Sequence, residues 1–184
     1  MAISAPLGNL GWKAPDFDLT DTFGIHRKLE SVRGPSGLVV MFICNHCPYV
    51  KAIMDRICYD AHEIQAMGFG VAAVMSNDPR AYPEDSFPNM QKLAKQLNFS
   101  FPYLFDATQD VARAYGAACT PDFFGFNQAL ELQYRGRLDS SESRPAAADN
   151  RRELVEAMHL IAETGIGPTE QFASIGCSIK WRNG

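Results

Sequence analysis

The sequence predicts an α/β protein with a central mixed β-sheet flanked by helices. Two uninterrupted apolar runs, residues 38–43 and 71–75, are typical of strands that are buried on both faces. Between them, apolar side chains recur at intervals of three and four over residues 47–67, which indicates an amphipathic helix. Strands that alternate with helices in this way favour an α/β sandwich.

Turn-forming residues divide the first part of the chain into short elements. Residues 14–20 alternate apolar and polar side chains and lead into a turn at 21–24, so they predict an N-terminal β-hairpin that extends the fold. Pro48 fits the first turn of the helix at 47–67, where a missing N–H costs little. Gly68 is the expected end of that helix.

The second part of the chain continues the alternation with shorter elements. Polar, proline-containing residues 76–88 predict a loop at the C-terminal edge of the second strand. After this loop we expect a helix at 89–97, an edge strand at 103–106, a short helix at 108–115, a strand hairpin formed by 122–127 and 130–138, and a final helix at 149–164. The tail, residues 166–184, has no clear period and is predicted to be irregular. No repeat is present, so residues 1–184 are expected to form a single domain.

Composition narrows the class of protein. The chain has 184 residues, of which 46% are hydrophobic and 21% charged, as in ordinary globular proteins. A net charge of −4 argues against a general binder of nucleic acid or of anionic membranes. No apolar run approaches the roughly 20 residues that span a bilayer. The first residues lack the basic start and apolar core of a signal peptide, so we expect a cytoplasmic protein.

The sequence Cys44-Asn45-His46-Cys47 carries the clearest chemical signal. It lies where the first apolar strand passes into the amphipathic helix, and a CxxC at that junction is a redox dithiol signature. Two sulfurs at this spacing can close a small disulfide ring. The N–H groups and the positive dipole end of the helix favour a thiolate, which is the reacting form of cysteine.

Taken together, these motifs resemble the thioredoxin fold, and the N-terminal hairpin resembles its peroxiredoxin branch. The sequence is most similar to the peroxiredoxin-like, AhpC/TSA-type proteins, which share the Cys-Asn-His-Cys-Pro-Tyr-Val motif at 44–50, Thr-Pro-Asp-Phe-Phe at 120–124, and a Gly-Cys-Ser-Ile-Lys-Trp tail at 176–181. The resemblance implies that Thr120 and Pro121 form a cis peptide bond facing the dithiol. A substrate strand is then expected to bind against Thr120 and Pro121.

The predicted function is thiol-disulfide exchange without a bound cofactor. We expect Cys44, just outside the helix, to be the more exposed sulfur and the nucleophile, and Cys47 to be more buried and to resolve the mixed disulfide. His46 lies between them and is expected to stabilise the thiolate, which makes a disulfide more oxidising than that of thioredoxin. The partners would be protein or small-molecule thiols and disulfides, with another thiol system as the upstream reductant.

Three other functions remain open on the sequence. A thiol peroxidase would use Cys47 as the peroxidatic residue, but the supporting Thr and Pro of peroxiredoxins are replaced here by Cys44 and Val40, which favours dithiol exchange. A Zn or Cu(I) protein would use Cys44, His46 and Cys47 as ligands. A non-catalytic module that binds a partner is the third alternative.

The chain has three further cysteines outside the motif. Cys177 lies in the tail and is a possible third redox cysteine, provided that the tail reaches the dithiol. Cys119 precedes Thr120 and could approach the dithiol, whereas Cys58, about three helical turns beyond Cys47, is expected to be a packing residue.

Overall fold

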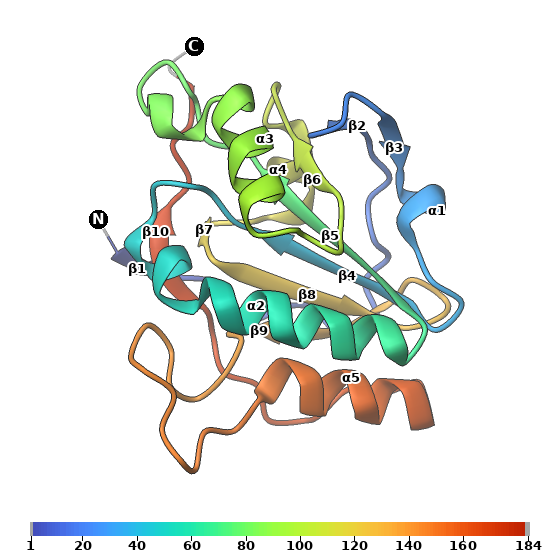
Figure 1. The fold of residues 1–184 in the computed structure, drawn as a ribbon. Helices are drawn as coiled ribbons and strands as arrows, with labels where there is room; N and C mark the ends of the chain where they lie inside the picture. The colour runs from blue at the N-terminus through green and yellow to red at the C-terminus, as the bar shows by residue number, and fades with distance from the viewer. Residues whose placement is uncertain (1, 183–184) are drawn as a thin grey trace.

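A seven-stranded mixed sheet forms the centre of the protein (Figure 1). The computed structural model describes residues 2–182. In spatial order the strands are β3 (His26–Lys28), β2 (Asp18–Asp21), β6 (Tyr103–Phe105), β5 (Phe69–Met75), β4 (Gly37–Phe42), β8 (Asp122–Phe126) and β9 (Leu132–Gly136). β4, β5 and β6 run parallel and the other neighbours are antiparallel, so the predicted mixed sheet is confirmed.

Strand β4 shows why helices cover both faces of the sheet. All of its residues are buried, and successive side chains point to opposite faces. Val39 and Met41 join one apolar core, which packs beneath α2 (Pro48–Ala66), α3 (Phe87–Gln96) and α5 (Glu153–Thr164). Val40 and Phe42 join the second core, on the side of α1 (Leu29–Val32) and α4 (Asp110–Tyr115). The sequence therefore specifies a sheet that has no solvent-facing side at its centre.

Most predicted elements are confirmed, with shifted ends, but the predicted edge strand β6 lies inside the sheet, between β2 and β5. The N-terminal hairpin is β2 and β3, and its turn contains Gly24 at φ +80°. Helix α2 begins at Pro48, one residue later than predicted. The loop over residues 76–88 contains a short 3-10 helix, η1 (Pro83–Asp85), and the first residues of α3. The last helix begins at Glu153 rather than at 149.

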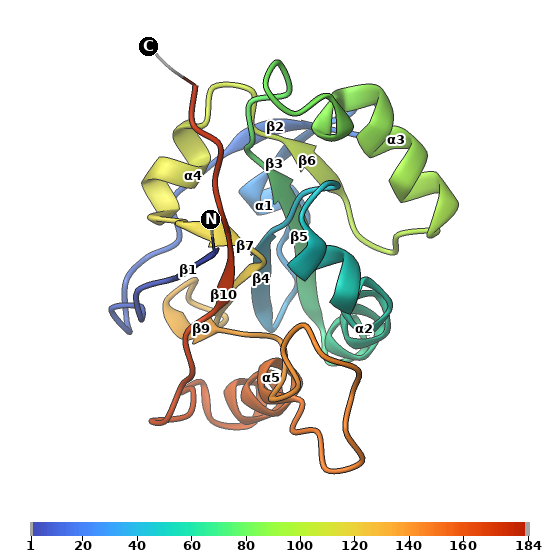
Figure 2. The same cartoon turned by 90° about the vertical axis from the view of Figure 1, so that its left-hand side faces the viewer.

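The prediction of an irregular tail is wrong for residues 175–178. They form β10 (Ile175–Ser178), which lies between β1 (Ala2–Ser4) and β7 (Cys119–Thr120) in a second, three-stranded sheet (Figure 2). Gly176 permits this pairing, because a Cβ at that position would lie 2.0 Å from the Thr120 carbonyl oxygen. The segment Gly-Cys-Ser has no apolar alternation, so its strand depends on these long-range partners. The last tail residues, 183–184, lie outside the described part of the chain.

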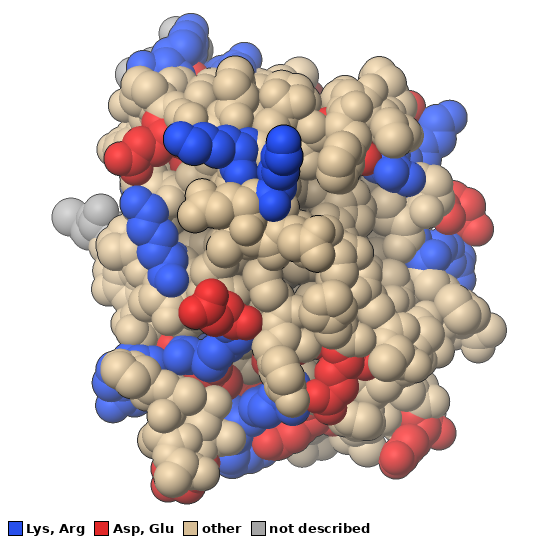
Figure 3. Space-filling model, viewed as in Figure 1, with Lys and Arg blue, Asp and Glu red and all other residues tan. Residues whose placement is uncertain are grey.

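The surface agrees with the charge balance of the sequence. On the face shown in Figure 3, basic and acidic side chains are interspersed rather than separated into large regions of one sign. Within residues 2–182, no helix has both the length and the apolar character needed to cross a membrane.

Candidate functional site

The dithiol lies where β4 ends and α2 begins, as the sequence predicts. Cys47 is the residue immediately before the first turn of α2, and Cys44 follows the end of β4 after Ile43. Both sulfurs contact Thr120: Cys44 Sγ lies 3.3 Å from its Oγ1, and Cys47 Sγ lies 3.2 Å from its carbonyl oxygen. The peptide bond between Thr120 and Pro121 is cis. Thr120 therefore contacts both sulfurs of the dithiol.

Both cysteines are fully buried, and the expectation that Cys44 is the exposed sulfur is wrong. Each has an exposed fraction of 0%. The sequence could not show this, because the covering groups come from distant segments. Asp85, in the loop after β5, contacts the residues that follow Cys44, and Cys177 on β10 lies against Cys47.

The two thiols differ in acidity. The hydrogen bond from the Cys44 thiol lowers the pKa of Cys47 to about 4, against the opposing effect of burial. Cys177 and the Val50 N–H in the first turn of α2 also stabilise the Cys47 thiolate. The pKa of Cys44 is raised, because it gives its hydrogen bond to Cys47, is buried and faces the Asp85 carboxylate. Of the two thiols Cys47 is therefore the more acidic, which favours Cys47 over Cys44 as the nucleophile.

His46 is held by a buried carboxylate. Its Nδ1 lies 2.5 Å from Asp85 Oδ2 and 3.7 Å from Cys44 Sγ. Because an ionised carboxylate only accepts, the Nδ1 atom carries a hydrogen and can share it with the Cys44 sulfur. The imidazole stacks on Tyr82 at a ring distance of 4.5 Å. The Nδ1 hydrogen is therefore held by Asp85, with the Cys44 sulfur as its second, longer neighbour.

Asp85 is the main site residue that the sequence reasoning missed. Its exposed fraction is 0%, and its carboxylate accepts from the backbone N–H groups of Asn45 and His46, at 2.8 and 3.0 Å, and from Asn77 Nδ2 at 2.9 Å. The available signal was an acidic residue in a proline-rich loop that follows a parallel strand, a common location for functional groups. That signal does not distinguish Asp85 from its exposed neighbour Glu84.

We expect Asp85→Ala to destabilise the protein by about 2–4 kcal/mol. The variant removes the acceptor for four buried or partly buried donors, and each unsatisfied buried donor costs about 1–3 kcal/mol before water or rearrangement compensates. Urea unfolding followed by circular dichroism measures the difference. Glu84→Ala is the matched control, since this carboxylate is exposed and only pairs with Lys51 at 3.7 Å. Equal urea midpoints for the two variants would contradict the role given to Asp85.

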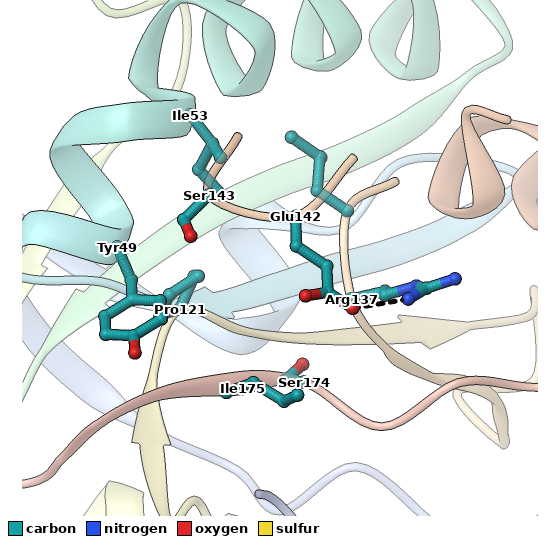
Figure 4. A pocket seen from close by; sticks show the side chains of 9 residues that line it. Tyr49, Ile53, Pro121, Arg137, Glu142, Ser143, Ser174 and Ile175 are labelled. Carbon is teal, nitrogen blue, oxygen red and sulfur yellow. Dashed lines mark hydrogen bonds and ion pairs between the residues drawn. The ribbon is translucent and has the colours of Figure 1, made fainter. Parts of the chain in front are cut away.

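The predicted docking edge at Thr120 is already occupied by the protein itself. β10 pairs with β7, with Cys177 opposite Thr120, so a substrate strand cannot add there in this conformation. Pro121 instead lines a small hollow of about 20 Å³ between the start of α2 and the start of β10 (Figure 4). Tyr49 and Ile175 form parts of its wall.

The ligand set predicted for a metal site is not the set that the structure brings together. The Cys44, His46 and Asp85 ligand atoms all lie within 4.8 Å of one another, whereas Cys47 is outside this group.

The remaining cysteines fall into two groups. Cys119 is buried with its thiol toward the Pro121 carbonyl oxygen at 3.6 Å, and burial raises its pKa to about 12. Cys58 is half-buried against the core beneath α2. Cys177 is the cysteine outside the motif that contacts Cys47.

Comparison with known proteins gives the family of the chain. Residues 10–138 match the AhpC/TSA family. The thiol-disulfide oxidoreductase ResA of Geobacillus thermodenitrificans is 29% identical over 118 residues, which make up 62% of this chain and 62% of that protein, so the match spans less than two thirds of that relative. The crystal structure of an uncharacterized conserved protein from Geobacillus kaustophilus is 42% identical, covers 100% of this chain and 98% of that one, and gives a TM-score of 0.94.

A more distant structure identifies the fold. The exposed lipoprotein thioredoxin of Streptococcus pneumoniae superposes with a TM-score of 0.56 over 81% of this chain and 98% of that one, at 19% identity. The fold is therefore thioredoxin-like, as the sequence predicts.

Proposed function

Because the chain belongs to the AhpC/TSA family, we propose that it is a thiol-disulfide oxidoreductase that cycles between a Cys44–Cys47 dithiol and disulfide. One observation carries this proposal. Both sulfurs lie against Thr120, and the Cys44 thiol stabilises a thiolate on Cys47. A thiolate next to a second thiol is the reactive form of a redox dithiol.

The geometry assigns different tasks to the two sulfurs. Cys47 is the exchange sulfur, because its thiolate is the better nucleophile in the reduced pair and the better leaving group in a disulfide. Cys44 closes the pair by bonding to Cys47 and leaves as a thiol when the disulfide opens. His46 Nδ1, 3.7 Å away, supplies the proton that Cys44 needs on leaving.

Disulfide mapping across glutathione redox buffers tests the proposal. We expect mass spectrometry of peptides to show a Cys44–Cys47 link that forms and disappears with the buffer potential. The Cys58 peptide should remain reduced and serves as the internal control. A protein that forms no Cys44–Cys47 link under any buffer would refute the function.

Peroxide reduction at Cys47 is the second candidate function, and the lowered pKa of Cys47 is the observation that favours it. Against it, this chain has Val40 where peroxiredoxins have a Pro, and Cys44 where they have a Thr. Stopped-flow mixing of the reduced protein with hydrogen peroxide separates the two functions. In a Cys44→Ser variant we expect sulfenic acid to form slowly on Cys47, because Val40 does not hold a peroxide as the peroxiredoxin Pro does. Rapid formation in that variant would favour the peroxidase.

The proposed partners are external thiols and disulfides, with an upstream thiol system as electron donor. The similarity to ResA supports this class of partner, and the buried dithiol needs no other cofactor for exchange. A cytoplasmic location stays a prediction from the sequence.

A further inference from the structure

Cys177, on strand β10, is more accessible than either sulfur of the dithiol. It is partly exposed, whereas Cys44 and Cys47 have an exposed fraction of 0%. Exchange requires an external sulfur to come into contact with a protein sulfur. The buried pair therefore needs a route to the outside.

Cys177 is held in contact with the exchange sulfur. In the antiparallel pair of β7 and β10 it lies opposite Thr120, whose carbonyl oxygen is 3.2 Å from Cys47 Sγ. Cys177 packs against the core cluster that contains Cys47 and stabilises the thiolate form of Cys47, which lowers the pKa of Cys47. Gly176 allows the close approach of the two backbones, because no Cβ fits beside the Thr120 carbonyl. The three sulfurs therefore form a series with Cys47 in the middle.

We propose that Cys177 is a third redox thiol, through which external thiols exchange with the buried Cys44–Cys47 pair. The inference rests on the proposed function and adds the route to it. In the oxidised protein, the Cys177 thiolate attacks Cys47 Sγ. A Cys47–Cys177 bond forms, the Cys44–Cys47 bond breaks, and Cys44 leaves with the electron pair and takes a proton, which replaces the one that Cys177 lost to solvent.

External thiols then complete the reaction. One thiolate attacks Cys177 Sγ, so that a mixed disulfide forms on Cys177 and Cys47 leaves as a thiolate. A second external thiolate attacks the external sulfur of this mixed disulfide and releases Cys177. Two external thiols have become one disulfide, and their two electrons remain on the Cys44 and Cys47 thiols. The lowered pKa of Cys47 makes it the favoured leaving group in the step that admits the external thiol.

A small hollow lies near Cys177. Side chains alternate along β10, so Ile175 and Cys177 point to the same face. Ile175 lines this hollow together with Tyr49, Ile53 and Pro121 (Figure 4). Its volume of about 20 Å³ holds about one water molecule, so the external thiol reaches Cys177 from the surface and not from a preformed pocket.

Disulfide mapping of a Cys44→Ser variant tests whether Cys47 and Cys177 can form a disulfide bond. After oxidation with glutathione disulfide we expect a Cys47–Cys177 link in this variant, and a Cys44–Cys47 link in the wild-type protein. If the wild type forms its link but the variant forms none, the inference fails and the proposed function stands. If the wild type forms no Cys44–Cys47 link, the function itself fails.

Reduction kinetics test the route. We expect the Cys44–Cys47 disulfide of a Cys177→Ser variant to be reduced by glutathione at least about tenfold more slowly than that of the wild type, with its potential nearly unchanged. Serine has nearly the size of cysteine, and a thermal melt checks that β10 remains in place. Cys58→Ser, which removes a cysteine outside the site, should react at the wild-type rate. An unchanged rate in Cys177→Ser would overturn the proposal.

Discussion

A Cys47→Ser variant should lose disulfide exchange by about a thousandfold or more, the largest effect that we expect from any single substitution. Cys47 contacts both of the other site sulfurs, and its thiolate is the one that the structure stabilises. A hydroxyl in its place can neither form nor leave a disulfide. The reduction of a small disulfide by the prereduced protein, followed by the released thiol, measures the loss.

Two other variants separate this role from general damage to the site. Cys44→Ser should lose the Cys44–Cys47 disulfide, because the sulfur that closes the pair is gone, and should accumulate the Cys47–Cys177 disulfide instead. Cys58→Ser should behave as the wild type. If Cys47→Ser kept the wild-type rate and Cys44→Ser lost it, the assignment of the two sulfurs would be reversed.

The second large effect concerns the redox potential of the Cys44–Cys47 pair. We expect a value less negative than about −270 mV, the potential of thioredoxin. Lowering the pKa of Cys47 to about 4 stabilises the reduced form at neutral pH, and a more stable reduced form makes the disulfide a stronger oxidant. A potential at or below that of thioredoxin would contradict this electrostatic account.

The pH dependence of the same potential gives an independent check. Between about pH 5 and 8, Cys47 is a thiolate while Cys44, with its raised pKa, stays protonated. Reduction then takes up two electrons and one proton, so the potential should fall by about 30 mV per pH unit rather than about 59 mV. Cys44→Ala removes the hydrogen bond to Cys47, so it should raise the pKa of Cys47 in a titration of thiolate absorbance at 240 nm. A slope near 59 mV at neutral pH would show that no thiolate is present.

The sequence predicted the parts of the fold that depend on local pattern. The apolar run that became β4 and the 3–4 spacing that became α2 are determined by residues close together in the chain. They also fix the junction at which Cys44 and Cys47 lie. The resemblance to thioredoxin supplied Thr120 and its cis bond, which are confirmed.

What the sequence did not predict depends on contacts between distant segments. Asp85 reaches His46 across 39 positions of the chain, and nothing in its local sequence marks it as buried. β10 forms because β1 and β7 offer it partners, and its own residues have no strand-like alternation. Because these same segments cover the sulfurs, the exposure of Cys44 and the acidity of Cys47 could not be derived from the spacing of the motif.

The order of the small sheet has a practical consequence for work on this protein. Ala2 lies opposite Cys177, which in turn lies opposite Thr120, so both ends of the described chain are only one or two strands from the reactive sulfurs. An affinity tag or fusion partner at the N-terminus would therefore be attached next to the strand that carries Cys177. Enzymatic assays should therefore use tag-free material, and a fluorescent label is better attached far away, for instance on the exposed surface of α5.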